Sequence, residues 1–213
     1  LEKVQPGADG SGDMLQPETI SRFRAALAGH PMNSRGTTHI SVVDGQDNAA
    51  SLTLSNGEGS GYVLPGTGIM LNNMLGEEDL NPGGFHRWDA NVRVSSMMAP
   101  TLAMDDKRVI AIGSGGSNRL RTAILQTLNN LYDYGMDARA AVDSPRIHVE
   151  GDLLSIEPGF PESVAEQVCA AFPQHHRWSE RNLFFGGTHT VIHEGRAFSG
   201  AGDPRRGGVF RVV

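Results

Sequence analysis

Residues 34–44 read SRGTTHISVVD, and this stretch indicates how the chain begins its fold. The alternation from residue 37 onward predicts a β-strand over 37–44, with one face formed by Thr37, His39, Ser41 and Val43. A second run of this kind covers residues 48–55, so we expect a hairpin. The preceding linker, residues 30–36, contains Pro, Asn, Ser and Gly, and its end at Gly36 is the clearest boundary in the chain.

The bond between Gly36 and Thr37 is a candidate cleavage site. If it is cut, Thr37 carries both a hydroxyl and a free α-amine. An α-amine, whose pKa is near about 8, can accept the hydroxyl proton at neutral pH and so activate the oxygen as a nucleophile. Gly-Thr pairs also begin ordinary strands, so this stretch by itself leaves both interpretations open.

Composition limits the classes of function. The 213 residues suffice for one large domain or two small ones. A net charge of -6 without a basic stripe argues against nucleic acid as a partner. No apolar run reaches transmembrane length, and residue 1 begins no signal-peptide pattern. The single cysteine, Cys169, excludes an internal disulfide framework and is expected to be buried.

Helical periodicity predicts a helix from Pro17 to Gly29 and a short helix over 137–142. The longest helix is expected to begin at a Ser117 cap, to end at Gly135 and to bury Leu120, Ile124, Leu128 and Leu131. A further helix over 161–172 is expected to turn Val164, Val168 and Cys169 inward.

Strands are expected over 99–104, 108–113 and 153–156, the second of them buried on both faces because it is almost continuously apolar. A last hairpin joins 188–193 to 196–200. These elements together predict α/β layers with mostly antiparallel pairing.

Six ordered blocks of sequence resemble one family. They are TTHISVVD at 37–44, GIMLNN at 68–73, VSSMMAPT at 94–101, GSGGSNR at 113–119, DSPR at 143–146 and GDPR at 202–205. In order and spacing they are similar to the small subunit of γ-glutamyltranspeptidase, a family of N-terminal-nucleophile hydrolases. The resemblance covers residues 37–205, most of the chain.

The resemblance implies an α+β fold, the αββα four-layer sandwich of N-terminal-nucleophile (Ntn) hydrolases, completed by a large subunit from the same precursor. Residues 1–36 would be the tail of that subunit, and residues 37–213 the small-subunit catalytic domain. It implies no cofactor and no metal, and it allows a heterotetramer. Relatives are often periplasmic or extracellular, which leaves the compartment open, the cytoplasm included.

The resemblance also implies chemistry. Thr37 would attack the Gly36 carbonyl, and an N-to-O shift followed by ester hydrolysis would free its amine. In turnover Thr37 would attack a γ-glutamyl amide, such as a glutathione-like donor. The resulting acyl-enzyme would pass its acyl group to water or to an amine.

Other roles carry over by position. Ser55 stands eighteen residues after Thr37, where the family has a second Thr hydrogen-bonded to the nucleophile. Ser95 and Ser96 match a Ser pair that binds the substrate α-carboxylate, alongside an Arg expected from the large subunit. Two hydroxyls suit a carboxylate because each donates one hydrogen bond. Without this context, a polar loop pair is the default interpretation of Ser95 and Ser96.

Gly115 and Gly116 match the family's oxyanion hole, in which backbone N–H groups approach the developing negative charge. By themselves they are also compatible with a turn before a helix or a phosphate cradle. A P-loop is excluded, since no Lys-Ser or Lys-Thr follows.

Three departures from the family pattern put the donor in question. Gly57 stands where the family often has Asn, and Glu77 falls where an Asp holds the substrate α-amine. The family's Pro-Gly-Gly is here Gly115-Gly116-Ser117.

Three alternatives therefore remain. One is a related acylase acting on a β-lactam side chain or a poly-γ-glutamate, and another is a non-catalytic homologue. The third is a metallohydrolase using His175, His176, His189 and His193, although solvated or packed histidines are favoured. We further expect Arg205 and Arg206 to lie at the surface or at a subunit contact.

Overall fold

The computed structural model describes Pro17, Glu18, Ser21 and residues 36–213, and residues 35–213 form one compact unit, described here by itself. The helix expected from Pro17 to Gly29 falls largely outside the described residues. Within the described part of the chain, no helix is both long and apolar enough to cross a bilayer.

The first two strands form the expected hairpin. β1 (Thr37–Val43) pairs antiparallel with β2 (Ala49–Ser55), in a register that sets Thr37 opposite Ser55. The inward face of the hairpin is polar. The Ser41 hydroxyl donates to the His189 carbonyl at 3.0 Å, and the Ser51 hydroxyl donates to the Ile112 carbonyl at 3.0 Å.

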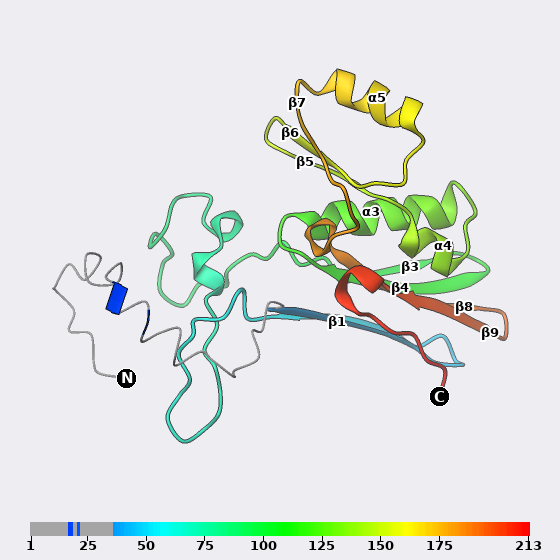
Figure 1. Cartoon of the computed structure of the whole chain (residues 1–213). Coiled ribbons are helices and arrows are strands. Elements are labelled where there is room, and N and C mark those ends of the chain that lie inside the picture. The colour runs from blue at the N-terminus through cyan, green and yellow to red at the C-terminus, as the bar shows by residue number, and fades with distance from the viewer. Residues whose placement is uncertain (1–16, 19–20, 22–35) are drawn as a thin grey trace. The chain divides into compact units, whose positions relative to one another are not determined.

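Both acceptors belong to a four-stranded antiparallel sheet of order β3-β4-β8-β9. Its strands are β3 (Thr101–Met104), β4 (Arg108–Gly115), β8 (Gly187–Glu194) and β9 (Ala197–Gly202). β4 is buried almost throughout, as predicted from its apolar run. The hairpin packs on one face of this sheet, and helices α3 and α4 cover the other (Figure 1).

α3 (Arg119–Tyr132) and α4 (Ala138–Asp143) form the main core with β4, β8 and β9, in which Ile110, Ile112, Ile124, Leu131 and Val142 are buried. The Asp137 side chain caps α4 by accepting from the Ala140 N–H.

The predicted limits of the longest helix were wrong. Ser117 has a left-handed φ of 49° and lies outside α3, whose N-cap residue, Asn118, makes no side-chain cap. At the other end, α3 stops at Tyr132, and Gly135 lies in the turn that follows.

A smaller layer contains β5 (Ile147–Glu150), β6 (Leu153–Ile156), β7 (Gln174–Arg177) and α5 (Glu162–Ala171). β5 and β6 are antiparallel, whereas β6 and β7 are parallel. Cys169 is buried here as expected, but the inward placement of Val164 was wrong. Val164 is 41% exposed, and Ala165 takes the inward position.

Short 3-10 helices interrupt the longer connections. η1 (Met74–Gly76) and η2 (Glu78–Leu80) lie in the irregular segment between β2 and β3. η3 (Leu183–Phe185) precedes β8, and η4 (Pro204–Arg206) follows β9.

The surface placement of Arg205 was wrong. Its side chain is buried and contacts the carboxylates of Glu157 and Asp203, the latter at 3.2 Å. Arg146 contacts the other Asp203 oxygen at 2.7 Å and is also buried. Two arginines and two acids thus neutralise one another inside the protein, which fixes η4 against β6 and α4.

Candidate active site

The side chain of Thr37 lies beside that of Ser55 at the end of the hairpin. Their hydroxyl oxygens are 2.9 Å apart, which satisfies the hydrogen bond expected between these residues. The Ser55 oxygen also accepts from the Gly57 N–H at 3.0 Å. That backbone donor fixes the orientation of Ser55, and Ser55 in turn orients the Thr37 hydroxyl.

The Gly36 carbonyl, the candidate point of cleavage, is also held. It accepts a hydrogen bond from the Asn56 N–H at 2.8 Å. A Cβ placed on Gly36 would lie 1.4 Å from the Gly57 carbonyl oxygen, so only glycine fits at position 36. The Gly36–Thr37 bond is therefore packed against the backbone that follows β2.

Gly57, which stands where the family often has Asn, has a backbone conformation that suits glycine. Its φ of 65° is left-handed, and an added Cβ would lie 2.4 Å from the Asn73 side-chain oxygen. That oxygen accepts from the N–H groups of Glu58 at 2.8 Å and Gly59 at 3.0 Å. Asn73 thus braces the loop after Ser55, a role that sequence reasoning missed although Asn73 lies in one of the six blocks.

Gly115 ends β4 beside Thr37, and Gly116 follows it against Gly186. A Cβ on Gly115 would be 3.4 Å from the Thr37 Cβ, and a Cβ on Gly116 would be 2.9 Å from the Gly186 Cα. Gly116 also has a φ of 129°. The end of β4 therefore lies beside Thr37 at Gly115, where a side chain would touch the nucleophile's own.

The other candidate residues have different surroundings. Glu77 is half-buried and accepts a hydrogen bond from the Ser117 hydroxyl at 3.3 Å, which places its carboxylate one residue from Gly116. Ser95 and Ser96 are exposed, and the Ser96 oxygen accepts from the Met98 N–H at 3.0 Å. The structure thus brings Thr37, Ser55, Gly57 and Gly115 together, whereas the described contacts join neither Ser95 nor Ser96 to them.

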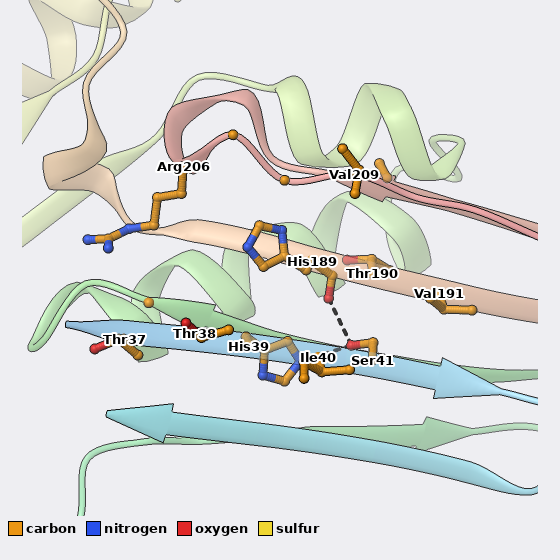
Figure 2. Close-up of a pocket in the computed structure, with 14 residues that line it drawn as sticks. Thr37, Thr38, His39, Ile40, Ser41, His189, Thr190, Val191, Arg206 and Val209 are labelled. Carbon is orange, nitrogen blue, oxygen red and sulfur yellow. Dashed lines mark hydrogen bonds between the residues drawn. The ribbon is translucent and has the colours of Figure 1, made fainter. Parts of the chain in front are cut away.

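A cavity of about 480 Å³ opens beside Thr37, between β1 on one side and β8 and residues 206–209 on the other (Figure 2). His39 and His189 face it with their rings stacked 6.4 Å apart. Burial, reinforced by the charge of His189, lowers the pKa of His39 to about 4. Burial also lowers the pKa of His189, and Arg206 and Arg146 reinforce this effect while Asp203 opposes it.

The hydrogen bonds of His39 indicate which tautomer its neutral ring adopts. The Ser41 hydroxyl gives its proton to the His189 carbonyl, so it accepts from the His39 Nε2–H at 2.9 Å. The opposite ring nitrogen, Nδ1, then accepts from the Thr53 hydroxyl at 2.8 Å.

This arrangement predicts a stability that depends on pH. The pKa of His39 is about 4 in the fold and about 6.5 in the unfolded chain, so the unfolded chain binds the proton first. Its contribution is fully present above pH 6.5 and is lost progressively down to pH 4, by at most about 1.4 kcal/mol per pH unit. Thermal unfolding of His39→Gln should therefore be less pH-sensitive than that of the unmodified protein. His175→Gln, at an exposed histidine, should match the unmodified protein, and parallel curves for all three would contradict the assignment.

The other histidines of the metal hypothesis lie on two different strands, His175 and His176 on β7 and His193 on β8. His175 and His176 are exposed on β7, whereas His193 is buried, stacks on Phe198 and pairs with Asp47 at 2.6 Å. Among the described residues, no group of three or more His, Cys, Asp or Glu side chains could hold a metal ion.

Comparison with known proteins identifies the family. Residues 11–213 match the family model described as gamma-glutamyltranspeptidase. The acylase ACY 1 proenzyme of Pseudomonas sp. (strain SE83) is 34% identical over 76% of this chain and 29% of its own length. The glutathione hydrolase proenzyme of Bacillus subtilis (strain 168) is 33% identical over 81% of this chain and 30% of its own.

A solved structure is also similar. The γ-glutamyltranspeptidase of Pseudomonas nitroreducens superposes with a TM-score of 0.71 at 28% identity, covering 83% of this chain and 99% of that one. All of these relatives are enzymes. The chain belongs to the γ-glutamyltranspeptidase family. It spans about 30% of the length of the two curated relatives, whose names describe them as proenzymes.

Proposed function

We propose that this chain carries the nucleophile of an autoprocessing threonine amidohydrolase or acyltransferase that cleaves γ-glutamyl amides. The observation that carries the proposal is the position of Thr37. Thr37 is the first residue of β1, and its hydroxyl oxygen lies 2.9 Å from that of Ser55. The residue adjoins Gly115 and lines a cavity of about 480 Å³. Family membership supports the reaction class, and the geometry supports the choice of residue.

In autoprocessing, the Thr37 oxygen attacks the Gly36 carbonyl while Ser55 orients its hydroxyl. The C–N bond breaks, the Thr37 nitrogen takes up a proton as the new amine, and Gly36 becomes an ester on the Thr37 oxygen. Water then hydrolyses the ester. The cleavage separates residues 1–36 from residues 37–213 and leaves Thr37 with its own base.

In turnover, the Thr37 amine takes the hydroxyl proton as the oxygen attacks the amide carbonyl. We assign the stabilisation of the oxyanion to the backbone at Gly115 and Gly116, the first of which lies beside Thr37. The amine leaves with a proton, and water or another amine accepts the acyl group.

Substrate-binding roles belong to residues farther from Thr37. The Glu77 carboxylate would hold the substrate α-amine, and the Ser95 and Ser96 hydroxyls its α-carboxylate. Gly57 would contribute backbone where relatives often have an amide side chain.

The outer face of the hairpin supports a protein partner. Ile40, Val42, Leu52 and Leu54 all lie on this face and are each about half exposed. A row of this kind on a two-stranded sheet normally packs against another layer. A large subunit cut from the same precursor would supply that layer and complete an αββα sandwich. Two such pairs would make a heterotetramer.

Intact-mass spectrometry of the full-length protein tests the proposal. The unmodified protein should yield a fragment that begins at Thr37, and Thr37→Ala should stay uncut. Thr38→Ala is the matched control, since Thr38 is exposed on the opposite face of β1 and should be cut normally. Cleavage in Thr37→Ala, or none in the unmodified protein, would contradict the assignment.

A second candidate is an acylase in the same family. It is favoured by the similarity to acylase ACY 1, which at 34% identity is close to the 33% of the glutathione hydrolase, and by Gly57 and Glu77 at substrate positions. A donor screen distinguishes the two. Faster release from γ-glutamyl-4-nitroanilide supports the proposed reaction, whereas faster release of a β-lactam side chain supports the acylase.

A further inference from the structure

Ser117 has a backbone conformation that serine rarely adopts. Its φ of 49° is left-handed, which crowds the Cβ of any residue except glycine. The start of α3 holds this conformation on both sides. Before it, the Gly116 carbonyl accepts from the Arg119 N–H at 3.0 Å, and after it, its own carbonyl accepts from the Leu120 N–H at 3.1 Å. A backbone of this kind persists only where its surroundings fix it, and such positions are common at functional sites.

The hydroxyl of Ser117 has two acceptors within reach. The Glu77 carboxylate and the Asn118 side-chain oxygen each lie 3.3 Å from it. One hydroxyl donates one proton, and an ionised carboxylate is the stronger acceptor. The Asn118 amide nitrogen donates in turn to the Glu150 carboxylate, which holds the Asn118 side chain beside Ser117. The Ser117 proton is therefore directed to Glu77, which comes from the irregular segment between β2 and β3.

The main chain of Glu77 is fixed independently of Ser117. Its N–H donates to the Met74 carbonyl at 3.0 Å, and its carbonyl accepts from the Asn81 amide at 2.7 Å. Asn81 is buried and accepts from the Trp88 Nε1–H at 3.2 Å. The Glu77 side chain keeps its rotatable bonds, and among the described residues only the Ser117 hydroxyl donates to its carboxylate. The direction of the carboxylate therefore depends on Ser117.

The carboxylate of Glu77 is also available to a cation. Asp79, two residues further on, pairs with Arg121 at 4.0 Å, whereas within the described part of the chain no lysine or arginine pairs with Glu77. A carboxylate can accept about four hydrogen bonds, so the bond from Ser117 leaves room for an ammonium group. Glutamate has one rotatable bond more than aspartate, so an additional contact is needed to order its carboxylate.

We propose that Ser117 is a positioning residue, whose hydroxyl orients the Glu77 carboxylate toward the α-ammonium group of the donor. Ser117 acts through Glu77 and not by contact with the donor. Because Ser117 directly follows Gly116, the same bond holds the carboxylate beside the segment assigned to the oxyanion. This inference rests on the proposed function and adds the residue that orders its amine site.

Two donors that differ by one amine test the proposal in the full-length protein. γ-Glutamyl-4-nitroanilide and glutaryl-4-nitroanilide share the carboxylate, the acyl chain and the leaving group. Ser117→Ala should raise KM for the γ-glutamyl donor by about 3–10-fold, the effect of one hydrogen bond, and change kcat by less than about twofold. It should change kcat/KM for the glutaryl donor by less than about twofold, because that donor has no ammonium group.

Ser117→Gly separates the hydroxyl from the backbone. Glycine also lacks the hydroxyl but takes a left-handed φ without crowding, so it should raise KM as much as Ser117→Ala does. Ser144→Ala is the control, since it removes a hydroxyl that donates to the Ala140 carbonyl at the end of α4. Recovery of KM in Ser117→Gly would assign the effect to the backbone and overturn the proposal. An equal loss for both donors, or no loss for either, overturns it as well. Thermal unfolding of each variant excludes a folding defect, and Ser117→Gly carries the comparison if Ser117→Ala does not fold.

Direct binding separates failure of this inference from failure of the proposed function. If the unmodified protein cleaves neither donor, the γ-glutamyl reaction is wrong, and calorimetry with L-glutamate and glutarate decides about Ser117. The same comparison serves if only the γ-glutamyl donor is cleaved. L-Glutamate should bind at least about tenfold more tightly than glutarate, and Ser117→Ala should reduce this ratio by about 3–10-fold. Equal binding of the two by the unmodified protein, an unchanged ratio in Ser117→Ala, or preferred cleavage of the glutaryl donor overturns the proposal.

Discussion

Full-length protein carrying Thr37→Ala should hydrolyse γ-glutamyl-4-nitroanilide at least about 10⁴-fold more slowly than the unmodified protein, the scale set by loss of a covalent nucleophile. The variant loses the attacking oxygen and, because the Gly36–Thr37 bond stays intact, also the free amine that serves as its base. Release of 4-nitroaniline measures the rate directly.

Thr37→Ser is the informative companion. It keeps the hydroxyl and the partner 2.9 Å away at Ser55, and it should retain both cleavage and measurable turnover. Residual activity of Thr37→Ala within about tenfold of the unmodified protein would show that another residue performs the attack.

Asp203→Ala should destabilise the fold by about 3–5 kcal/mol, the usual cost of removing one partner from a buried ion pair. Arg146 and Arg205 would remain buried, with only Glu157 to oppose their charges. For a protein of this size the midpoint of thermal unfolding should fall by about 6–20 °C.

Low pH should also destabilise the fold, as Asp203→Ala does. Burial by itself would raise the pKa of Asp203, but the charges of Arg146 and Arg205 and the hydrogen bonds to it outweigh that effect and hold it below its usual value. The stabilisation is therefore present above pH about 4 and is lost as the pH falls through the lower folded pKa.

Glu162→Ala is the matched control for Asp203→Ala, since Glu162 pairs with Arg177 at the surface and its loss should leave the midpoint nearly unchanged. Equal effects of the two substitutions would show that the buried cluster contributes no more than a surface pair.

Much of this fold was predictable from local pattern. The hairpin, the buried β4 and the final hairpin of β8 and β9 follow from period-2 alternation and from turn residues between the runs. The capped start of α4 follows from Asp137 in the same way. These features depend on neighbours in sequence, which a single chain displays.

Features that depend on distant contacts were missed. β5 and β7 lack a clear alternation, and their pairing with β6 defines them. Serine is a common helix cap, but Ser117 has a left-handed backbone, and its hydroxyl donates to the Glu77 carboxylate instead. Arg205 looks like a surface charge until Glu157 and Asp203, from two other parts of the chain, are brought beside it.

In the candidate site, too, some residues were identified from the sequence and others were not. The pair Thr37 and Ser55 was predicted from the resemblance to the family, and the antiparallel register of β1 and β2 sets the two residues opposite each other. Arg206 was expected at the surface or at a subunit contact, since only the pairing of Gly115 with Gly187 shows the space along which its side chain lies.

The polar contacts between the two sheets constrain motion in a way that an apolar contact surface would not. Apolar faces can shift past one another with little change in free energy. The hydrogen bonds from Ser41 to His189 and from Ser51 to Ile112, in contrast, each require a particular length and direction. Backbone pairing fixes β1 within its own layer, and these hydroxyls fix it against the next. Hydrogen bonds within the hairpin and hydrogen bonds to the neighbouring sheet therefore restrain β1 in two directions. We expect the distance between Thr37 and Gly115 to change little when either sheet fluctuates.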